Sequence, residues 1–172
     1  MIITQSQWAS LVNIDKSFFR HPEKMQFSIV RAADQFISLV GIMPQNLCDW
    51  RDDRDSQHIE GTAIDLYFNG ADPLEINQLA FNSKLFSGIG LYWNDRNVAS
   101  HHFDRRPNRT VEYPAKWGCF ITHPYDEQRQ EHVAFYQYTT IDNIIGVIKK
   151  KLALPGLFLV VCGFVLYLLM RK

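Results

Sequence analysis

The stretch that organises this chain is residues 56–65, which read Ser56-Gln57-His58-Ile59-Glu60-Gly61-Thr62-Ala63-Ile64-Asp65. Gly61, Ala63 and Asp65 fall on alternate positions, which is the period of a β-strand, so Asp65 should project from the same face as two very small residues. Small neighbours leave room for an ion and a substrate beside the carboxylate. His58 precedes the strand in a turn-rich approach and can fold back over that face. Imidazole nitrogens and carboxylate oxygens are ordinary zinc ligands, so the stretch predicts a metal site.

The pattern Ser-x-His-x-x-Gly-x-Ala-x-Asp resembles the signature of the zinc D-Ala-D-Ala carboxypeptidases. That group includes the vancomycin-resistance dipeptidases, phage murein endopeptidases and the hedgehog signalling domain. A second block also looks like the family: a Gly-Ile-Gly-aromatic strand, a turn, a His-x-Asp strand and a basic-Trp pair. In this chain these are Gly88-Ile89-Gly90-Leu91-Tyr92, His102-Phe103-Asp104 and Lys116-Trp117. The resemblance covers roughly residues 22–118, and it implies a mainly antiparallel sheet that cradles the metal, with helices packed on its other side.

The resemblance implies His58, Asp65 and His102 as the zinc ligands, which would leave one position open for water. Neighbouring strand residues point to opposite faces, so only one of His101 and His102 can face the metal. The His-x-Asp match favours His102, and His101 remains the alternative. Asp104 lies on the face of His102 and is expected either to accept the second N–H of that imidazole or to act on the bound water.

The general base is not fixed by the sequence. Many relatives carry an acid three residues before the final histidine, where this chain has Ala99. Other relatives carry histidines where this chain has Asn97 and Ser100. Asp104 and His101 are therefore the candidates for taking the proton of the water. The missing acid also favours an alternative reading, a zinc-binding module without hydrolysis.

The loop at residues 44–57 carries candidate substrate-binding residues. On composition alone it is a solvated polar loop, but Trp50-Arg51 resembles an aromatic-Arg pair of the family whose arginine binds the substrate carboxylate. A planar guanidinium can hold a carboxylate through two hydrogen bonds. Arg54 is the alternative to Arg51. Ser56 either donates a hydrogen bond near the site or shapes the turn before His58.

Composition narrows the classes of function. The chain has 18 basic and 18 acidic residues and no net charge, so no global basic field for nucleic acid exists. Its three cysteines are too few and too scattered for a disulfide framework, and none lies in a C-x-x-C pair, which argues against a cysteine zinc site. We expect Cys48 and Cys119 to be free buried thiols, with a bridge between them as the alternative.

Periodicity predicts the main helices. An apolar stripe at helical spacing predicts a helix that starts near Pro22 and stops at Gly41; its members are Met25, Ile29, Ala33, Phe36, Ile37 and Val40. Asp72 as N-cap and Pro73 in the first turn predict a helix over residues 72–81. At 172 residues the chain has room for one domain with a core and a short extra segment. Periodicity and composition alone give an α+β domain.

The C-terminal part has a different character. Residues 152–170 contain no charged residue and are flanked by Lys149-Lys150-Lys151 and Arg171-Lys172. This pattern predicts a transmembrane helix, with a buried globular helix as the alternative. The predicted organisation is a zinc peptidase-like domain at 1–123, a partly helical linker at 124–151 and the membrane helix at 152–170. No secretory signal is seen at the N-terminus. The basic residues favour a cytoplasmic catalytic domain anchored at its C-terminus in a bacterial inner membrane.

These expectations combine into one functional hypothesis. The chain is expected to be a zinc metallopeptidase that hydrolyses amide bonds in the peptide stem of peptidoglycan, as a D,D-carboxypeptidase or an endopeptidase. A phage or prophage lysis enzyme fits an anchored hydrolase that waits on the inner face of the membrane. The expected partners are the stem peptide and the membrane, and no nucleic acid. A membrane-anchored interaction protein whose metal only holds the fold is a further alternative.

Overall fold

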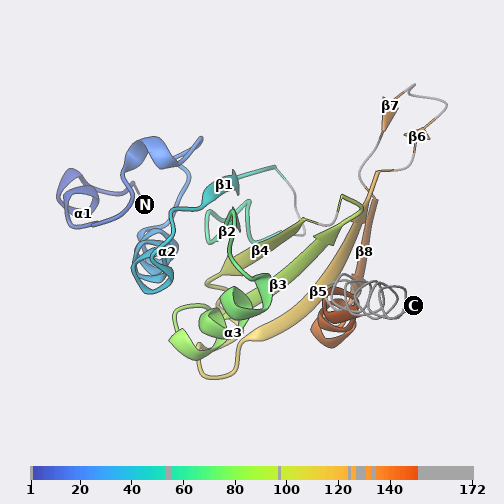
Figure 1. Cartoon of the computed structure of the whole chain (residues 1–172). Coiled ribbons are helices and arrows are strands. Elements are labelled where there is room, and N and C mark those ends of the chain that lie inside the picture. Colours follow the sequence, from blue (N-terminus) through green and yellow to red (C-terminus); the bar gives the residue numbers. More distant parts are fainter. Residues whose placement is uncertain are drawn as a thin grey trace, which may run out of the picture.

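The computed structural model describes residues 2–52, 56–96, 98–123, 125–126, 131–132 and 135–150. Its elements follow in the order α1 (Gln5–Ala9), a 3-10 turn η1 (Lys16–Phe18), α2 (Phe27–Val40), β1 (Gln45–Cys48), β2 (Ala63–Tyr67), α3 (Pro73–Ser83), β3 (Gly88–Asn94), β4 (Ala99–Asp104), β5 (Ala115–Thr122), β6 (Tyr125–Asp126), β7 (Glu131–His132) and β8 (Phe135–Thr139). Residues 141–150 are helical and follow β8 directly. Figure 1 shows these elements in chain order.

The central sheet has six strands in the order β1-β2-β4-β3-β5-β8, and its strand directions are mixed. Strands β2, β4 and β3 pair antiparallel, with Asp65 opposite His102 and Gly90 opposite His102 on the other side. Strand β5 then pairs with β3 in parallel. The connection after β4 crosses β3, so β5 pairs with the edge of β3 that does not face β4. Because β5 is antiparallel to β4, and β4 is antiparallel to β3, β5 is parallel to β3.

The observed fold is α+β as predicted, but the predicted architecture needs correction. The sheet is mixed, because β3 and β5 pair in parallel while its other strand pairs are antiparallel. The predicted C-terminal transmembrane helix is not found among the described residues, where no helix is long and apolar enough to cross a membrane. Residues 152–170, for which that helix was predicted, lie outside the described residues.

The two faces of the sheet have different roles. The side chains of Ile64, Ile89 and Phe103 point to one face and are buried in the main core with residues of α2 and α3. Alternate residues on the same strands, including Asp65 and His102, point to the opposite face. The helices α2 and α3 thus pack on the core side of the sheet, and Figure 1 shows both helices beside the strands. The opposite side carries the polar residues of the candidate site.

Helix α2 agrees with the prediction at its C-terminal end and differs from it at its start. The apolar stripe is buried except at Val40, which is half-buried, and Gly41 ends the helix with a left-handed φ of 72°, as the sequence predicted. The helix begins at Phe27 and not at Pro22. The reason is that Gln26 is extended and its N–H donates to the carbonyl of Gly61, so this residue ties the helix to the loop that carries His58.

The last described segment packs on the sheet. Strand β8 pairs with β5, and Ile144 and Ile148 of the following helix are fully buried against Leu91. Gly118 permits this contact, since a Cβ there would lie 2.3 Å from the side chain of Ile144. Residues 135–150, which were expected within a linker, therefore add a strand and a helix to the sheet.

Candidate metal centre

The candidate site is built on a row of side chains that crosses five strands. Register places Cys48 of β1 opposite Asp65 of β2, and Asp65 opposite His102 of β4. The row continues through Gly90 of β3 to Trp117 of β5. In-register neighbours on adjacent strands point to the same face, so these residues share one surface of the sheet. It is the surface opposite to the helices.

His58 reaches this row from a tight loop. Gly61 makes the loop possible: its φ is +64°, and a Cβ at this position would lie 1.9 Å from the carbonyl oxygen of Lys24. No other residue fits such a close backbone approach with a positive φ. Ser56 shapes the other side of the turn, because its Oγ accepts a hydrogen bond from the N–H of His58 at 3.3 Å. The imidazole is thereby folded over the row and is fully buried.

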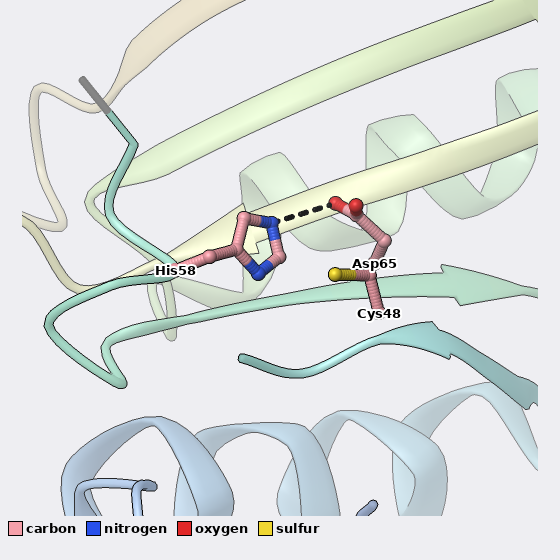
Figure 2. A group of neighbouring side chains, drawn as sticks. All are labelled: Cys48, His58 and Asp65. Atoms are coloured by element: carbon pink, nitrogen blue, oxygen red, sulfur yellow. Dashed lines mark ion pairs between the residues drawn. The ribbon is translucent and has the colours of Figure 1, made fainter. Parts of the chain in front are cut away.

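Three potential ligand atoms converge at one point. His58 Nε2 lies 3.3 Å from Asp65 Oδ1 and 3.2 Å from His102 Nδ1, and the last two atoms lie 2.8 Å apart. Zinc–ligand bonds of about 2.0–2.1 Å in a tetrahedron place ligand atoms about 3.3 Å from one another. The triangle formed by these atoms therefore has the size of a metal-binding face. Figure 2 shows His58 and Asp65 pointing toward each other, with their ion pair dashed.

Hydrogen bonds on the outer nitrogens fix both imidazoles. His58 Nδ1 lies 2.9 Å from the backbone carbonyl of Asp49, which can only accept, so Nδ1 carries the hydrogen. His102 Nε2 lies 3.1 Å from Asp104 Oδ2 and donates to that carboxylate. These partners leave His58 Nε2 and His102 Nδ1 as the atoms with free lone pairs. Both lone pairs point at Asp65, so three acceptors share a space that needs a positive charge.

The electrostatics of the cluster favour a bound cation. Burial lowers the pKa of His58, but hydrogen bonds to the side chains of Asp65 and Cys48 outweigh burial and raise this pKa well above its ordinary value. Burial raises the pKa of Asp65, yet its interactions with the imidazoles of His102 and His58, which donate to the carboxylate when they are protonated, more than offset burial and hold this pKa below the usual range. Both shifts describe a site that prefers a positive charge at its centre, as a proton or as a metal.

Cys48 joins the cluster, which the sequence analysis did not foresee. Its Sγ lies with one ligand atom each of His58 and Asp65 in a group whose members are all within 4.8 Å of one another. A metal ion can be held by these three residues (Figure 2). Cys48 and Cys119 are free thiols, Cys48 half-buried and Cys119 buried. Only the register of β1 on β2 brings Cys48 here, and nothing in its sequence spacing points to that register.

Asp104 is held from two sides. Besides the bond from His102, its Oδ1 accepts from the backbone N–H of Arg106 at 3.2 Å and from Arg106 Nε at 3.0 Å. Arg106 in turn lies over the ring of Trp117 at 4.7 Å. Gly88 leaves the space for this carboxylate, since a Cβ there would lie 2.2 Å from Asp104 Oδ1. Burial raises the pKa of Asp104, but the bonds from His102 and Arg106 prevail and lower it, so the carboxylate stays ionised.

His101, the alternative ligand, lies on the other face. Its Nε2 is 3.1 Å from the backbone carbonyl of Pro73, and its ring stacks on Phe103 with centroids 5.8 Å apart. The ring is buried, and burial lowers its pKa to about 4, so His101 is neutral at ordinary pH. The sheet lies between this imidazole and the converging ligand atoms. His101 therefore cannot reach a metal held by His58, Asp65 and His102.

The predicted substrate-binding residues lie beside the loop of His58. Arg51 Nη2 donates to Ser56 Oγ at 3.4 Å, which places the guanidinium next to the start of that loop. Trp50 is occupied in packing: its Nε1 donates to the carbonyl of Ile59, and its ring contacts His21 and the ammonium group of Lys24. Arg54, the alternative to Arg51, lies outside the described residues.

Asp49 is a further residue that the sequence analysis missed. Its buried carboxylate accepts from the backbone N–H groups of His21 and Trp50, which fixes the backbone that presents its carbonyl to His58. A charge-rich loop gives no sequence signal for such a role.

A scan against protein-family models found no match, and searches of curated proteins and of solved structures found none either.

Proposed function

We propose that this chain is a zinc-dependent amide hydrolase that acts on the peptide stem of peptidoglycan. The observation that carries the proposal is the convergence of His58 Nε2, Asp65 Oδ1 and His102 Nδ1 within 3.3 Å of one another, each imidazole fixed by a partner on its outer nitrogen. Two histidines and a carboxylate, with second hydrogen bonds to a carbonyl and a carboxylate, form a ligand set suited to catalytic zinc.

Each residue then has a defined task. Zinc, when bound, lowers the pKa of a coordinated water and polarises the scissile carbonyl. His58, Asp65 and His102 hold the ion, and the Asp49 carbonyl and Asp104 keep the two rings in the ligating orientation. Both oxygens of Asp104 already accept hydrogen bonds and the side chain is fully buried, which favours orientation over proton transfer.

Tyr92 is suited to bind the carbonyl oxygen of a substrate. It lies on the face of the site, two residues after Gly90, with its ring centroid 6.1 Å from that of His102. Burial raises the pKa of its hydroxyl above the ordinary value, so the group keeps its proton and can donate it in a hydrogen bond.

The substrate class rests on the resemblance of residues 56–65 and 88–117 to the murein peptidases. Arg51 supports it, because a guanidinium beside the loop of His58 suits the terminal carboxylate of a stem peptide.

A second candidate is a zinc-binding module without hydrolysis. Two observations favour it: Ala99 stands where many members of the resembled family have the acid, and Cys48 lies close enough to join the ligands. Four protein ligands are typical of structural zinc sites.

A zymogram separates the two candidates. Purified protein run in a gel that contains murein should clear a band, the band should vanish with chelator, and zinc should restore it. The His102→Gln variant should clear nothing. If folded, zinc-loaded wild-type protein clears no murein, the hydrolase proposal is wrong and the binding module takes its place.

A further inference from the structure

We propose that Cys48 is a fourth protein ligand of the metal, and that its sulfur occupies the coordination position that a hydrolytic water needs. The second part of this inference, that the sulfur blocks the water position, rests on the proposed function, since only a hydrolase needs that position open. It predicts a closed resting site that opens when the substrate or water displaces the sulfur.

The position of Cys48 in the sheet carries the argument. Cys48 is opposite Asp65 on one side, and His102 is opposite Asp65 on the other. The two residues therefore approach the carboxylate from opposite sides, while His58 covers the same point from its loop. A tetrahedral ion held by His58, Asp65 and His102 has one remaining position, and we assign it to Cys48 because its Sγ lies within 4.8 Å of ligand atoms of both His58 and Asp65.

The local geometry of β1 directs the side chain inward. The register of β1 on β2 shifts between Asn46 and Cys48, so one extra residue lies in this strand. Such an irregularity re-aims the next side chain. In Figure 2 the sulfur points into the space that His58 and Asp65 also face. The thiol sulfur lies within 4.8 Å of a ring nitrogen of His58.

The distances are compatible with ligation after a small contraction. The sulfur and its two neighbouring ligand atoms lie within 4.8 Å of one another. A zinc–sulfur bond of about 2.3 Å beside bonds of about 2.0 Å requires separations of about 3.5 Å. A χ1 adjustment of a half-buried cysteine on an edge strand can supply the difference. A thiolate also makes the site selective for soft or borderline ions such as zinc over magnesium or calcium.

Cobalt(II) in place of zinc gives the direct test, because a cobalt–thiolate bond produces a charge-transfer band in the near ultraviolet that imidazole and carboxylate ligands lack. Full-length wild-type protein loaded with Co²⁺ should show the band. Cys48→Ser should lose it but still bind one equivalent of metal. Cys119→Ser is the matched control, since this thiol is buried on β5 outside the cluster, and it should keep the band.

A second measurement needs no variant. Bound zinc should slow alkylation of Cys48 at least about tenfold relative to the metal-free protein, as read by mass spectrometry of the peptide. Absence of the band in wild type, its persistence in Cys48→Ser, or equal alkylation rates would each overturn the ligand assignment. Murein hydrolysis tests the proposed function separately. If wild type cleaves murein but shows no band, the ligand assignment is wrong and the proposed function stands. If wild type shows the band but neither it nor Cys48→Ser cleaves murein, the ligand assignment stands and the proposed function is wrong. Cys48→Ser should hydrolyse murein faster than wild type, because the position that the water needs is then open, and unchanged or slower cleavage would contradict the closed resting site.

Discussion

Two imidazole rings in the site are oriented by hydrogen bonds on the nitrogens that face away from its centre. The Asp49 carbonyl fixes His58, and the Asp104 carboxylate fixes His102. The difference between these partners matters, because a charged carboxylate makes the ligand nitrogen more basic than a neutral carbonyl does. We therefore expect Asp104 to affect metal affinity more than Asp49 does.

Asp104→Asn should weaken zinc binding by about 10- to 100-fold, the range typical of lost partners of ligating histidines. The amide removes the charge that strengthens His102 and leaves Arg106 without its anionic partner. Asp95→Asn is the control. Asp95 is an exposed carboxylate in the β3–β4 turn, and it also pairs with a histidine, His123. Competition with a chromophoric chelator measures both affinities. Equal losses in the two variants would refute the orienting role of Asp104.

Zinc affinity should also depend on pH in a particular range. The pKa of His58 is raised in the metal-free protein, so its proton adds stability below the ordinary histidine pKa, and this stability is lost as pH rises through the raised value. The metal must displace that proton. Affinity should thus keep rising above pH ~7.5, where a histidine of ordinary pKa, about 6.5, has already lost its proton. A plateau that begins at or below this pH in chelator titrations would contradict the raised pKa.

At the scale of elements, some strands of the sheet could be predicted from the local sequence and others could not. Strands β2, β3 and β4 were predictable because alternation and glycines are local signals, and they also place Asp65 and His102 on one face. Cys48 and Asp49 were not predictable, because their positions follow from pairing between β1 and β2 across a loop. The parallel β5 was missed for the same reason, since a crossover leaves no mark in local periodicity.

Residues 12–14 of the N-terminal segment are held to helix α2 by hydrogen bonds that the local sequence pattern does not predict. Asp34 of α2 is buried, and its carboxylate accepts the backbone N–H groups of Val12, Asn13 and Ile14. Asp34→Ala leaves these donors without a partner and should lower the free energy of unfolding by about 2–3 kcal/mol. Gln35→Ala, an exposed neighbour on the same helix, should change it by less than about 0.5 kcal/mol. Urea denaturation of both variants compares them, and equal midpoints would contradict this role of Asp34.

At the scale of the whole molecule, the site lies where two parts of the fold meet. The loop of His58 is tied to the start of α2 through Gln26 and Gly61, whereas Asp65 and His102 belong to the sheet. A metal that bonds to all three joins the loop to the sheet. The three proposed ligands could be named from the sequence, but the two faces of the sheet decide between the adjacent histidines, and only the packed helices define those faces.

The central claim is that His58, Asp65 and His102 hold one metal ion on the face opposite to the helices. The most direct test compares the metal content of purified His102→Gln and His101→Gln, adjacent substitutions of the same kind on opposite faces, with circular dichroism to verify folding. Wild type and His101→Gln should each carry about one zinc per chain, as expected for a mononuclear site, and His102→Gln should lose most of it. Full zinc retention in His102→Gln, or its loss from folded His101→Gln instead, would contradict the account.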